Sequence, residues 1–231
     1  MPIKRYTSKI VDFFFPRSCV GCGKGGDFIC ARCRSNLPYL PDSVCTKCGK
    51  PISGYDVCPS CKSSRVTIDG IRSVFRFDGV IRKAIHVFKY SHVKALVDPF
   101  AELLYTYLLA HPLQGAILVP VPLHRDRLKA RGYNQSALVA RKLGIYMNFP
   151  VSEDCLIRIK NSIPQVQTMN GEERTRNVAD AFNCRDGRLQ GKYVILVDDV
   201  CTTGATLDAC AVALKKSGVS SVWGITIARE I

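Results

Sequence analysis

VILVDDVCTTGAT, residues 194–206, joins an apolar strand to two acids, a run of small and hydroxyl residues and the start of a helix. The apolar run 192–197 is typical of a strand that a parallel sheet buries on both faces. Gly204 allows the backbone to turn tightly and to approach a bound group closely. Because ligands of open α/β sheets bind at the carboxyl ends of the strands, this stretch predicts both the fold class and the place of a ligand site.

Strand and helix patterns alternate around this stretch from about residue 70 onward. The strands that we expect are 71–77, 116–121, 192–197 and 221–228. The helices that we expect are 80–90, 99–110, a long one that opens with the basic segment near 124 and ends near 143, and 206–217. Residues 160–176 are polar and aperiodic, which indicates a loop. This alternation predicts an α/β fold with a parallel sheet flanked by helices.

The turn after the 192–197 strand has the groups that a sugar phosphate needs. Free amides at a helix N-terminus bind a phosphate without a charged side chain, and threonine hydroxyls add donors. Two adjacent carboxylates can accept hydrogen bonds from two neighbouring ribose hydroxyls. The alternative is an acidic turn that only caps the helix. The residues expected to contact the ribose and phosphate are Asp198, Asp199, Cys201, Thr202, Thr203, Gly204, Ala205 and Thr206.

A second polar segment, VPVPLHRDRLKARGYNQS at residues 119–136, follows another predicted strand. Its basic side chains offer several donors to a pyrophosphate, and a solvated basic helix is the alternative. The polar loop 160–176 would close over the ligand as a lid and exclude water. No side chain stands out as a general base, so we assign no catalytic residue. The residues expected in the pyrophosphate site or the lid are Pro122, His124, Arg125, Arg131, Asn134, Gln135 and Arg174.

Eight of the 12 cysteines form four Cys-x-x-Cys pairs. Each pair places two thiolates on one tight turn, so two pairs supply a tetrahedral four-sulfur site. Two structural zinc ions are therefore expected, held either by successive pairs or by interleaved ones. Redox chemistry would need one reactive pair on a thioredoxin-like unit, which this spacing does not resemble. The zinc ligands that we expect are Cys19, Cys22, Cys30, Cys33, Cys45, Cys48, Cys58 and Cys61.

The formal net charge is +14, and half of it falls in the first 66 residues. A basic surface of this density suits a polyanionic partner, because neutralised phosphates release counterions. No stretch approaches the roughly 18 apolar residues that a membrane-spanning helix needs, and the N-terminus lacks the pattern of a signal peptide. We expect a cytoplasmic protein without membrane insertion. Composition divides it into an amphipathic helix at 1–18, a double zinc ribbon at 19–66 and the α/β domain at 67–231.

The 194–206 stretch resembles the signature of type I phosphoribosyltransferases, which bind 5-phosphoribosyl-1-pyrophosphate (PRPP) together with Mg²⁺. The resemblance implies that the α/β domain is phosphoribosyltransferase-like. It also implies that Asp198 and Asp199 hold the ribose hydroxyls and that residues 201–206 hold the 5-phosphate. Purine-salvage members carry an Asp where this chain has Thr202, so a purine-salvage activity is disfavoured.

Four motifs together resemble the ComF family: the cysteine ribbon, PVPLH-x-x-R-x-x-x-RGYNQ at 120–135, the stretch Q-x-Q…ER-x-x-N-V-x-x-AF at 165–182 and VDDVCTTGAT at 197–206. That resemblance implies a role in DNA uptake during natural transformation. The expected partners are PRPP or a related phosphoribosyl compound, single-stranded DNA, and a helicase or other protein of the competence machinery. Phosphoribosyl transfer remains open. The alternative is a phosphoribosyltransferase of nucleotide metabolism with an unidentified nitrogenous acceptor.

Overall fold

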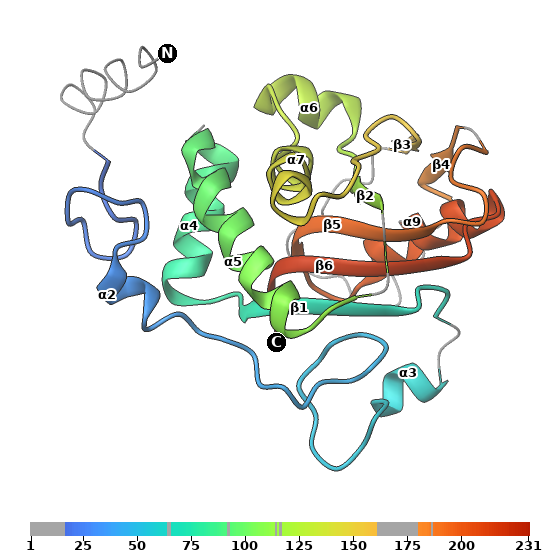
Figure 1. Ribbon diagram of the computed structural model, residues 1–231, viewed down its shortest axis with the longest axis horizontal. Coiled ribbons are helices and arrows are strands. Elements are labelled where there is room, and N and C mark those ends of the chain that lie inside the picture. Colours follow the sequence, from blue (N-terminus) through green and yellow to red (C-terminus); the bar gives the residue numbers. More distant parts are fainter. Residues whose placement is uncertain are drawn as a thin grey trace.

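The computed structural model describes residues 17–63, 66–91, 93–113, 115, 117–160, 180–185 and 187–231. A parallel sheet in the order β1-β6-β5-β2 forms its centre. Figure 1 shows the long strands β5 and β6 side by side, with the N-terminal ribbon segments outside the sheet. The elements are α2 (Ala31–Arg34), α3 (Pro59–Ser63), β1 (Gly70–Arg76), α4 (Gly79–Tyr90), the 3₁₀ turn η1 (Lys94–Leu96), α5 (Val97–Ala110), β2 (Ile117–Pro120), α6 (Arg125–Arg131), α7 (Gln135–Met147), β3 (Leu156–Arg158), β4 (Phe182–Cys184), β5 (Tyr193–Cys201), α9 (Ala205–Lys216) and β6 (Ser221–Arg229).

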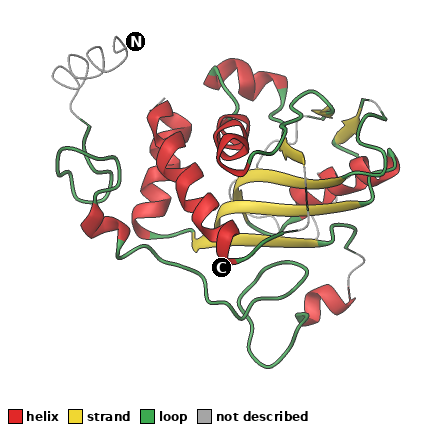
Figure 2. Cartoon of the chain, viewed as in Figure 1, coloured by secondary structure: helices red, strands yellow, loops and turns green. Residues whose placement is uncertain are grey.

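Helices cover both faces of the sheet and bury two separate cores. On one face α4, α5 and α7 pack their apolar sides against residues such as Ile195 and Val197 of β5. On the other face α9 and the β3–β4 pair cover Val194 and Leu196 of the same strand. Alternate residues of β5 are therefore buried on opposite faces, which explains why its sequence reads as an unbroken apolar run. The predicted parallel α/β fold is confirmed, and Figure 2 shows its helices and strands.

Two predicted elements differ from the structure. The long helix expected from about residue 124 to 143 is two helices, α6 and α7, because Gly132 ends the first in a left-handed conformation with φ +73°. Asn134 then caps the second by accepting a hydrogen bond from the Ser136 amide. The antiparallel pair β3–β4 was not expected at all. Each of its strands has three residues, too few for a periodic signal.

The cysteine-rich segment joins the sheet at the free side of β1. The Leu40 amide donates to Val74 O at 3.0 Å, and the Arg76 amide donates to Pro38 O at 2.8 Å. A strand edge without a partner offers open hydrogen-bonding groups to other chains. The linker between the two ribbons occupies part of this edge, so the ribbons are attached along the sheet rather than carried as a loose tail (Figure 1).

Residues 1–16 of the predicted amphipathic helix at 1–18, and most of the predicted lid, with Arg174, lie outside the described residues. No helix among the residues that the structure describes is both long enough and apolar enough to cross a membrane.

Candidate functional site

The two acids of β5 lie near its carboxyl end, and side chains from two helices hold them. Ser136 of α7 donates from Oγ to Asp198 Oδ1 at 2.9 Å, and the Asp199 amide donates to the same oxygen at 2.9 Å. On the other acid, Lys89 Nζ of α4 lies 2.7 Å from Asp199 Oδ1. The strand continues past the acids to Cys201, four residues further than expected, because β6 remains paired with it.

The environment of Asp198 favours its neutral form. Burial raises the pKa of Asp198 to about 7, and the neighbouring charge of Asp199 acts in the same direction. Lys89 and the hydrogen bonds from the Asp199 amide and Ser136 oppose the rise without cancelling it. Two close carboxylates of this kind cannot both ionise freely. At pH 7 the Asp198 carboxyl is therefore about half protonated, so it can donate as well as accept a hydrogen bond.

This shift makes the stability of the protein dependent on pH. The folded protein binds the Asp198 proton more tightly than the unfolded chain, so the free energy of unfolding falls as pH rises from about 4 to about 7 and is level beyond. The loss is on the order of a few kcal/mol, because one pKa unit corresponds to about 1.4 kcal/mol. Denaturant unfolding at pH 4.5 and 7.5 should show this loss in the wild type and a smaller one in Asp198→Asn. Equal losses in the two proteins would contradict the assignment.

The turn between β5 and α9 is tight and leads directly into a helix N-terminus. Gly204 has φ +89° and precedes the first residue of α9. A Cβ at this position would also stand 3.0 Å from Ile71 Cδ1. A larger residue would therefore be disfavoured both by the positive φ angle and by this close contact. The Thr203 hydroxyl accepts a hydrogen bond from the Ala205 amide at 3.2 Å. The other amides of the first helical turn have no partner within the helix and face the loop.

Cys201, the first residue of this loop, is a core side chain. It is buried, and Arg229 Nη1 lies 2.7 Å from its sulfur. Burial raises the pKa of the Cys201 thiol to about 11 despite the nearby guanidinium. The thiol is therefore neutral at pH 7, and only its backbone is available to a ligand.

A large cavity borders the acid pair on the side of β2 and α6. Its volume is about 780 Å³, and its lining includes Pro122, His124, Arg125 and Asn134, four of the residues expected to bind pyrophosphate. The acids and the 201–206 loop do not line it. Ser136, which donates to Asp198, separates the acid pair from the cavity, and its sequence neighbours Asn134 and Ala137 line the cavity. A ligand that filled both places would therefore pass over the end of β2 and β5.

The two other predicted pyrophosphate residues that are described, Arg131 and Gln135, contact each other instead. Arg131 Nη1 donates to Gln135 Oε1 at 2.6 Å, and the Arg131 guanidinium lies 5.4 Å from the centre of the Tyr90 ring. Gln135 is buried, and its Nε2 has no partner among the described residues. Arg158 of β3, by contrast, lines the cavity and lies within electrostatic range of Asp198.

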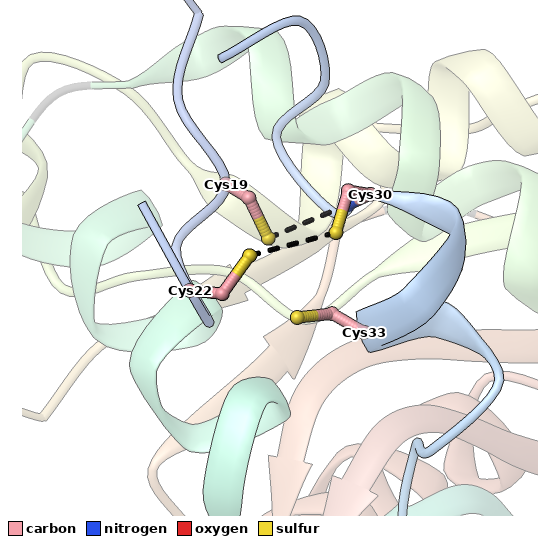
Figure 3. A group of neighbouring side chains, drawn as sticks. All are labelled: Cys19, Cys22, Cys30 and Cys33. Atoms are coloured by element: carbon pink, nitrogen blue, oxygen red, sulfur yellow. Dashed lines mark hydrogen bonds between the residues drawn. The ribbon is translucent and has the colours of Figure 1, made fainter. Parts of the chain in front are cut away.

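The eight paired cysteines form two separate clusters. Within each, the four sulfurs lie within 4.8 Å of one another; the clusters are Cys19, Cys22, Cys30, Cys33 and Cys45, Cys48, Cys58, Cys61. Figure 3 shows the four sulfurs of the first cluster turned toward a common centre. Successive pairs therefore share a site, which removes the interleaved alternative. In the described residues these are the only groups of three or more candidate metal ligands.

Backbone amides prepare each cluster for a metal ion. The Cys30 amide donates to Cys19 Sγ at 3.4 Å, and the Cys58 amide donates to Cys45 Sγ at 3.3 Å. Burial raises the pKa of the Cys19 thiol, but amides of Cys30 and its own turn outweigh this and lower the pKa to about 6. Four sulfurs with one preformed thiolate fit Zn²⁺ in a closed, structural site. When bound, the ion would cross-link two turns that have almost no apolar core.

Both clusters are packed against the α/β domain. A Cβ at Gly21 would stand 2.9 Å from Val80 of α4, the helix that carries Lys89. In the second cluster, a Cβ at Gly49 would stand 2.5 Å from Ile71 O, and the Ile71 amide donates to Lys47 O at 2.8 Å. Ile71 also touches the Gly204 turn. The second cluster is thus one residue away from the phosphate-type loop.

Three site residues were missed by the sequence analysis: Lys89, Ser136 and Arg229. Lys89 ends an amphipathic helix and Ser136 lies in the first turn of another, where such residues are usually solvated or cap the helix. Arg229 follows an apolar strand near the end of the chain. Each gains its role through a contact distant in sequence, and no local pattern announces such a contact.

A phosphoribosyltransferase-like α/β fold with a double zinc ribbon is the class that this architecture defines. A family model described as a double zinc ribbon domain matches residues 10–62. Competence protein ComFC of Bacillus subtilis (strain 168) is 29% identical over 217 residues, 90% of this chain and 86% of that protein. Competence protein F of Haemophilus influenzae is 28% identical over 222 residues, which cover 86% of this chain and 96% of that protein. DNA utilization protein YhgH of Escherichia coli (strain K12) is 27% identical over 200 residues, 84% and 87%. These matches, over most of the chain, support the ComF family.

Solved structures with a similar fold include a glutamine PRPP amidotransferase from B. subtilis complexed with ADP and GMP. It is 17% identical with a TM-score of 0.39, and the match covers 56% of this chain and 26% of that one, so this chain spans about a quarter of its length. An adenine phosphoribosyltransferase from Leishmania donovani is 13% identical with a TM-score of 0.38, covering 62% and 68%.

Proposed function

We propose that this ComF-family protein binds PRPP, or a closely related phosphoribosyl compound, as part of its role in the use of incoming DNA. The observation that carries the proposal is the acid pair at the carboxyl end of β5, directly before a glycine turn and a helix N-terminus. The roles of competence and DNA utilization belong to the relatives by name.

Each part of the ligand has a matching part of the site. The 5-phosphate would accept hydrogen bonds from the amides of residues 202–206. The ribose hydroxyls would bond to Asp198 and Asp199, whose orientation Ser136 and Lys89 maintain. The pyrophosphate would extend into the 780 Å³ cavity toward His124 and Arg125. Mg²⁺, when bound, would coordinate oxygens of the pyrophosphate and neutralise part of its charge.

The same arrangement supports transfer of the phosphoribosyl group. A nitrogen nucleophile would attack C1 of the ribose, the bond from C1 to the pyrophosphate oxygen would break, and pyrophosphate would leave with the electron pair. The basic lining of the cavity stabilises the charge on that leaving group. The acceptor would enter from the side of Leu123, Leu128 and Tyr133, the apolar part of the lining.

Titration calorimetry of the purified protein with PRPP and Mg²⁺ tests the proposal directly. We expect one site per chain and competition by ribose 5-phosphate, because both ligands share the phosphate and ribose contacts. Pyrophosphate release with candidate nitrogenous acceptors then tests transfer separately. A protein that gives no heat with PRPP under conditions where both cysteine clusters are loaded with zinc would refute the proposal.

We also propose that single-stranded DNA lies along α4. Arg82, Lys83, His86 and Tyr90 are exposed on this helix, and Tyr90 is 62% exposed. The His86 and Tyr90 rings are 4.7 Å apart, and these residues border a shallow hollow of about 750 Å³. Cations beside exposed rings bind phosphates and stack on bases without reading sequence. Phe88, on the same helix, is fully buried and belongs to the core, so it is not available for stacking.

Loss of Arg82 and Tyr90 should weaken the binding of single-stranded DNA. The double variant Arg82→Ala/Tyr90→Ala is expected to lose about tenfold to a hundredfold in affinity, and its salt slope should fall by about one. Fluorescence anisotropy with an oligonucleotide at several salt concentrations measures both. Lys192→Ala, which removes one exposed charge at the opposite end of β5, is the matched control. If that control weakened binding equally, the α4 surface would be excluded as the DNA site.

A further inference from the structure

Arg229, the last residue of β6, is the largest fully buried side chain in the described part of the molecule, with 0% exposure. An arginine is almost never fully buried unless it is paired. Its Nη1 lies 2.7 Å from Cys201 Sγ, but Nε and Nη2 have no hydrogen-bond acceptor among the described residues. Such a group is costly, because a buried cation without an anion loses its hydration and gains little in return.

No charge among the described neighbours compensates this guanidinium. The thiol of Cys201 is neutral at pH 7, since burial raises its pKa to about 11. Of the acids that are closest along β5, Asp199 is paired with Lys89 and Asp198 accepts from Ser136 and a backbone amide. No carboxylate of the described residues forms an ion pair with Arg229. Among the described residues, this buried positive charge therefore has no counter-ion.

The position of this charge is informative. Cys201 and Arg229 are directly paired across β5 and β6, and the Glu230 amide donates to Cys201 O at 2.9 Å. A Cβ at Gly204 would stand 3.9 Å from Cys201 Sγ. The guanidinium therefore lies close to the turn 201–204, because Cys201 Sγ is near both Arg229 Nη1 and the Gly204 backbone. The N-terminus of α9, a helix of 12 residues, adds its positive end of the dipole at the same place.

We propose that Arg229 is a positioning residue for a phosphate monoester: its buried charge favours a dianion on the 201–206 loop without touching it. The inference rests on the proposed function, in that it places the phosphate of the ligand on this loop. It adds a residue and a physical cause, an interior cation that acts through the loop. The uncompensated charge is then a cost of the free protein that the bound phosphate relieves.

The test compares Arg229→Met and Arg229→Gln, which remove the charge, with Arg229→Lys, which keeps it. Melting temperatures of the free proteins are measured first, then affinities for inorganic phosphate and for PRPP with Mg²⁺. We expect Arg229→Met to melt no lower than the wild type, because it removes an unpaired buried charge. Its affinity for both ligands should fall by about tenfold or more, and Arg229→Lys should restore most of it.

The control is Ser221→Ala at the opposite end of β6, which removes a hydrogen bond to Asp69 Oδ2 of 2.8 Å. It should lower the melting temperature and leave both affinities unchanged. The inference is overturned if Arg229→Met is less stable than the wild type but binds both ligands with the same affinity. The role of Arg229 would then be purely structural. Should Met and Gln both prevent folding, the same conclusion would follow. If the wild-type protein binds inorganic phosphate, loses this binding in Arg229→Met and does not bind PRPP, the inference stands and the proposed function is refuted. If the wild-type protein binds neither inorganic phosphate nor PRPP, both are refuted.

Discussion

Asp198→Asn/Asp199→Asn is expected to bind PRPP about tenfold to a hundredfold more weakly than the wild type. The reason is that the Asp199 carboxylate, which is paired with Lys89, is replaced by a neutral amide, and a hydrogen bond to a charged group contributes about 1.5–3 kcal/mol. The two carboxylates lie together at the strand end, and no other acid pair of the described residues adjoins the Gly204 turn. Titration calorimetry with PRPP and Mg²⁺ measures the loss. The fold should persist, because asparagine has nearly the same shape and removes the charge whose burial raises the pKa of Asp198.

The single variants separate the two acids. Asp199→Asn leaves Lys89 without its partner at 2.7 Å, so both binding and stability should fall. Asp198→Asn should reduce binding and leave stability at neutral pH equal or higher. Glu153→Gln is a suitable control, since Glu153 pairs with Arg141 at the border of the same cavity but lies away from the strand end. Unchanged PRPP affinity in the double variant would remove the acid pair from the site.

Removal of zinc from the second cluster is expected to have the largest effect on the protein as a whole. Structural zinc contributes on the order of 10 kcal/mol to the folding of small modules. The segment 45–61 has little else: its buried apolar residues are chiefly its own cysteines. We expect Cys48→Ser to unfold this segment, lower the melting temperature and release about one zinc ion per chain, as measured by a chromophoric zinc indicator.

The same variant should also weaken PRPP binding. Ile71 contacts the Gly49 turn on one side and the Gly204 turn on the other, so the second cluster supports the phosphate-type loop from behind. Cys22→Ser in the first cluster is the matched comparison, since that cluster packs on Val80 of α4 instead. Cys184→Ser, outside both clusters, controls for the loss of a thiol. If Cys48→Ser protein retained its zinc content, the assignment of the quartet would be wrong.

Local patterns were sufficient for much of this molecule. The apolar run in β5 showed a strand buried on both faces, and the spacing of the paired cysteines showed metal sites. The break between α6 and α7 is also a local feature, because Gly132 ends the first helix and Asn134 caps the second, but the sequence analysis did not use this signal. β3 and β4 were missed for a different reason, because three-residue strands depend on each other rather than on their own sequence.

The amino-acid sequence alone was enough for the parallel α/β class, the double zinc ribbon and the family, because strand burial, metal-ligand spacing and the glycine turn are all set by residues close together in the chain. Tertiary structure alone decided which cysteine pairs share a site, that Lys89 and Ser136 hold the acids, and that Arg229 is buried close to the loop. Those facts depend on contacts between segments as far apart as Lys89 and Asp199, and such contacts leave no trace in any local pattern. A side chain acquires its pKa and its partner only when the chain has closed around it.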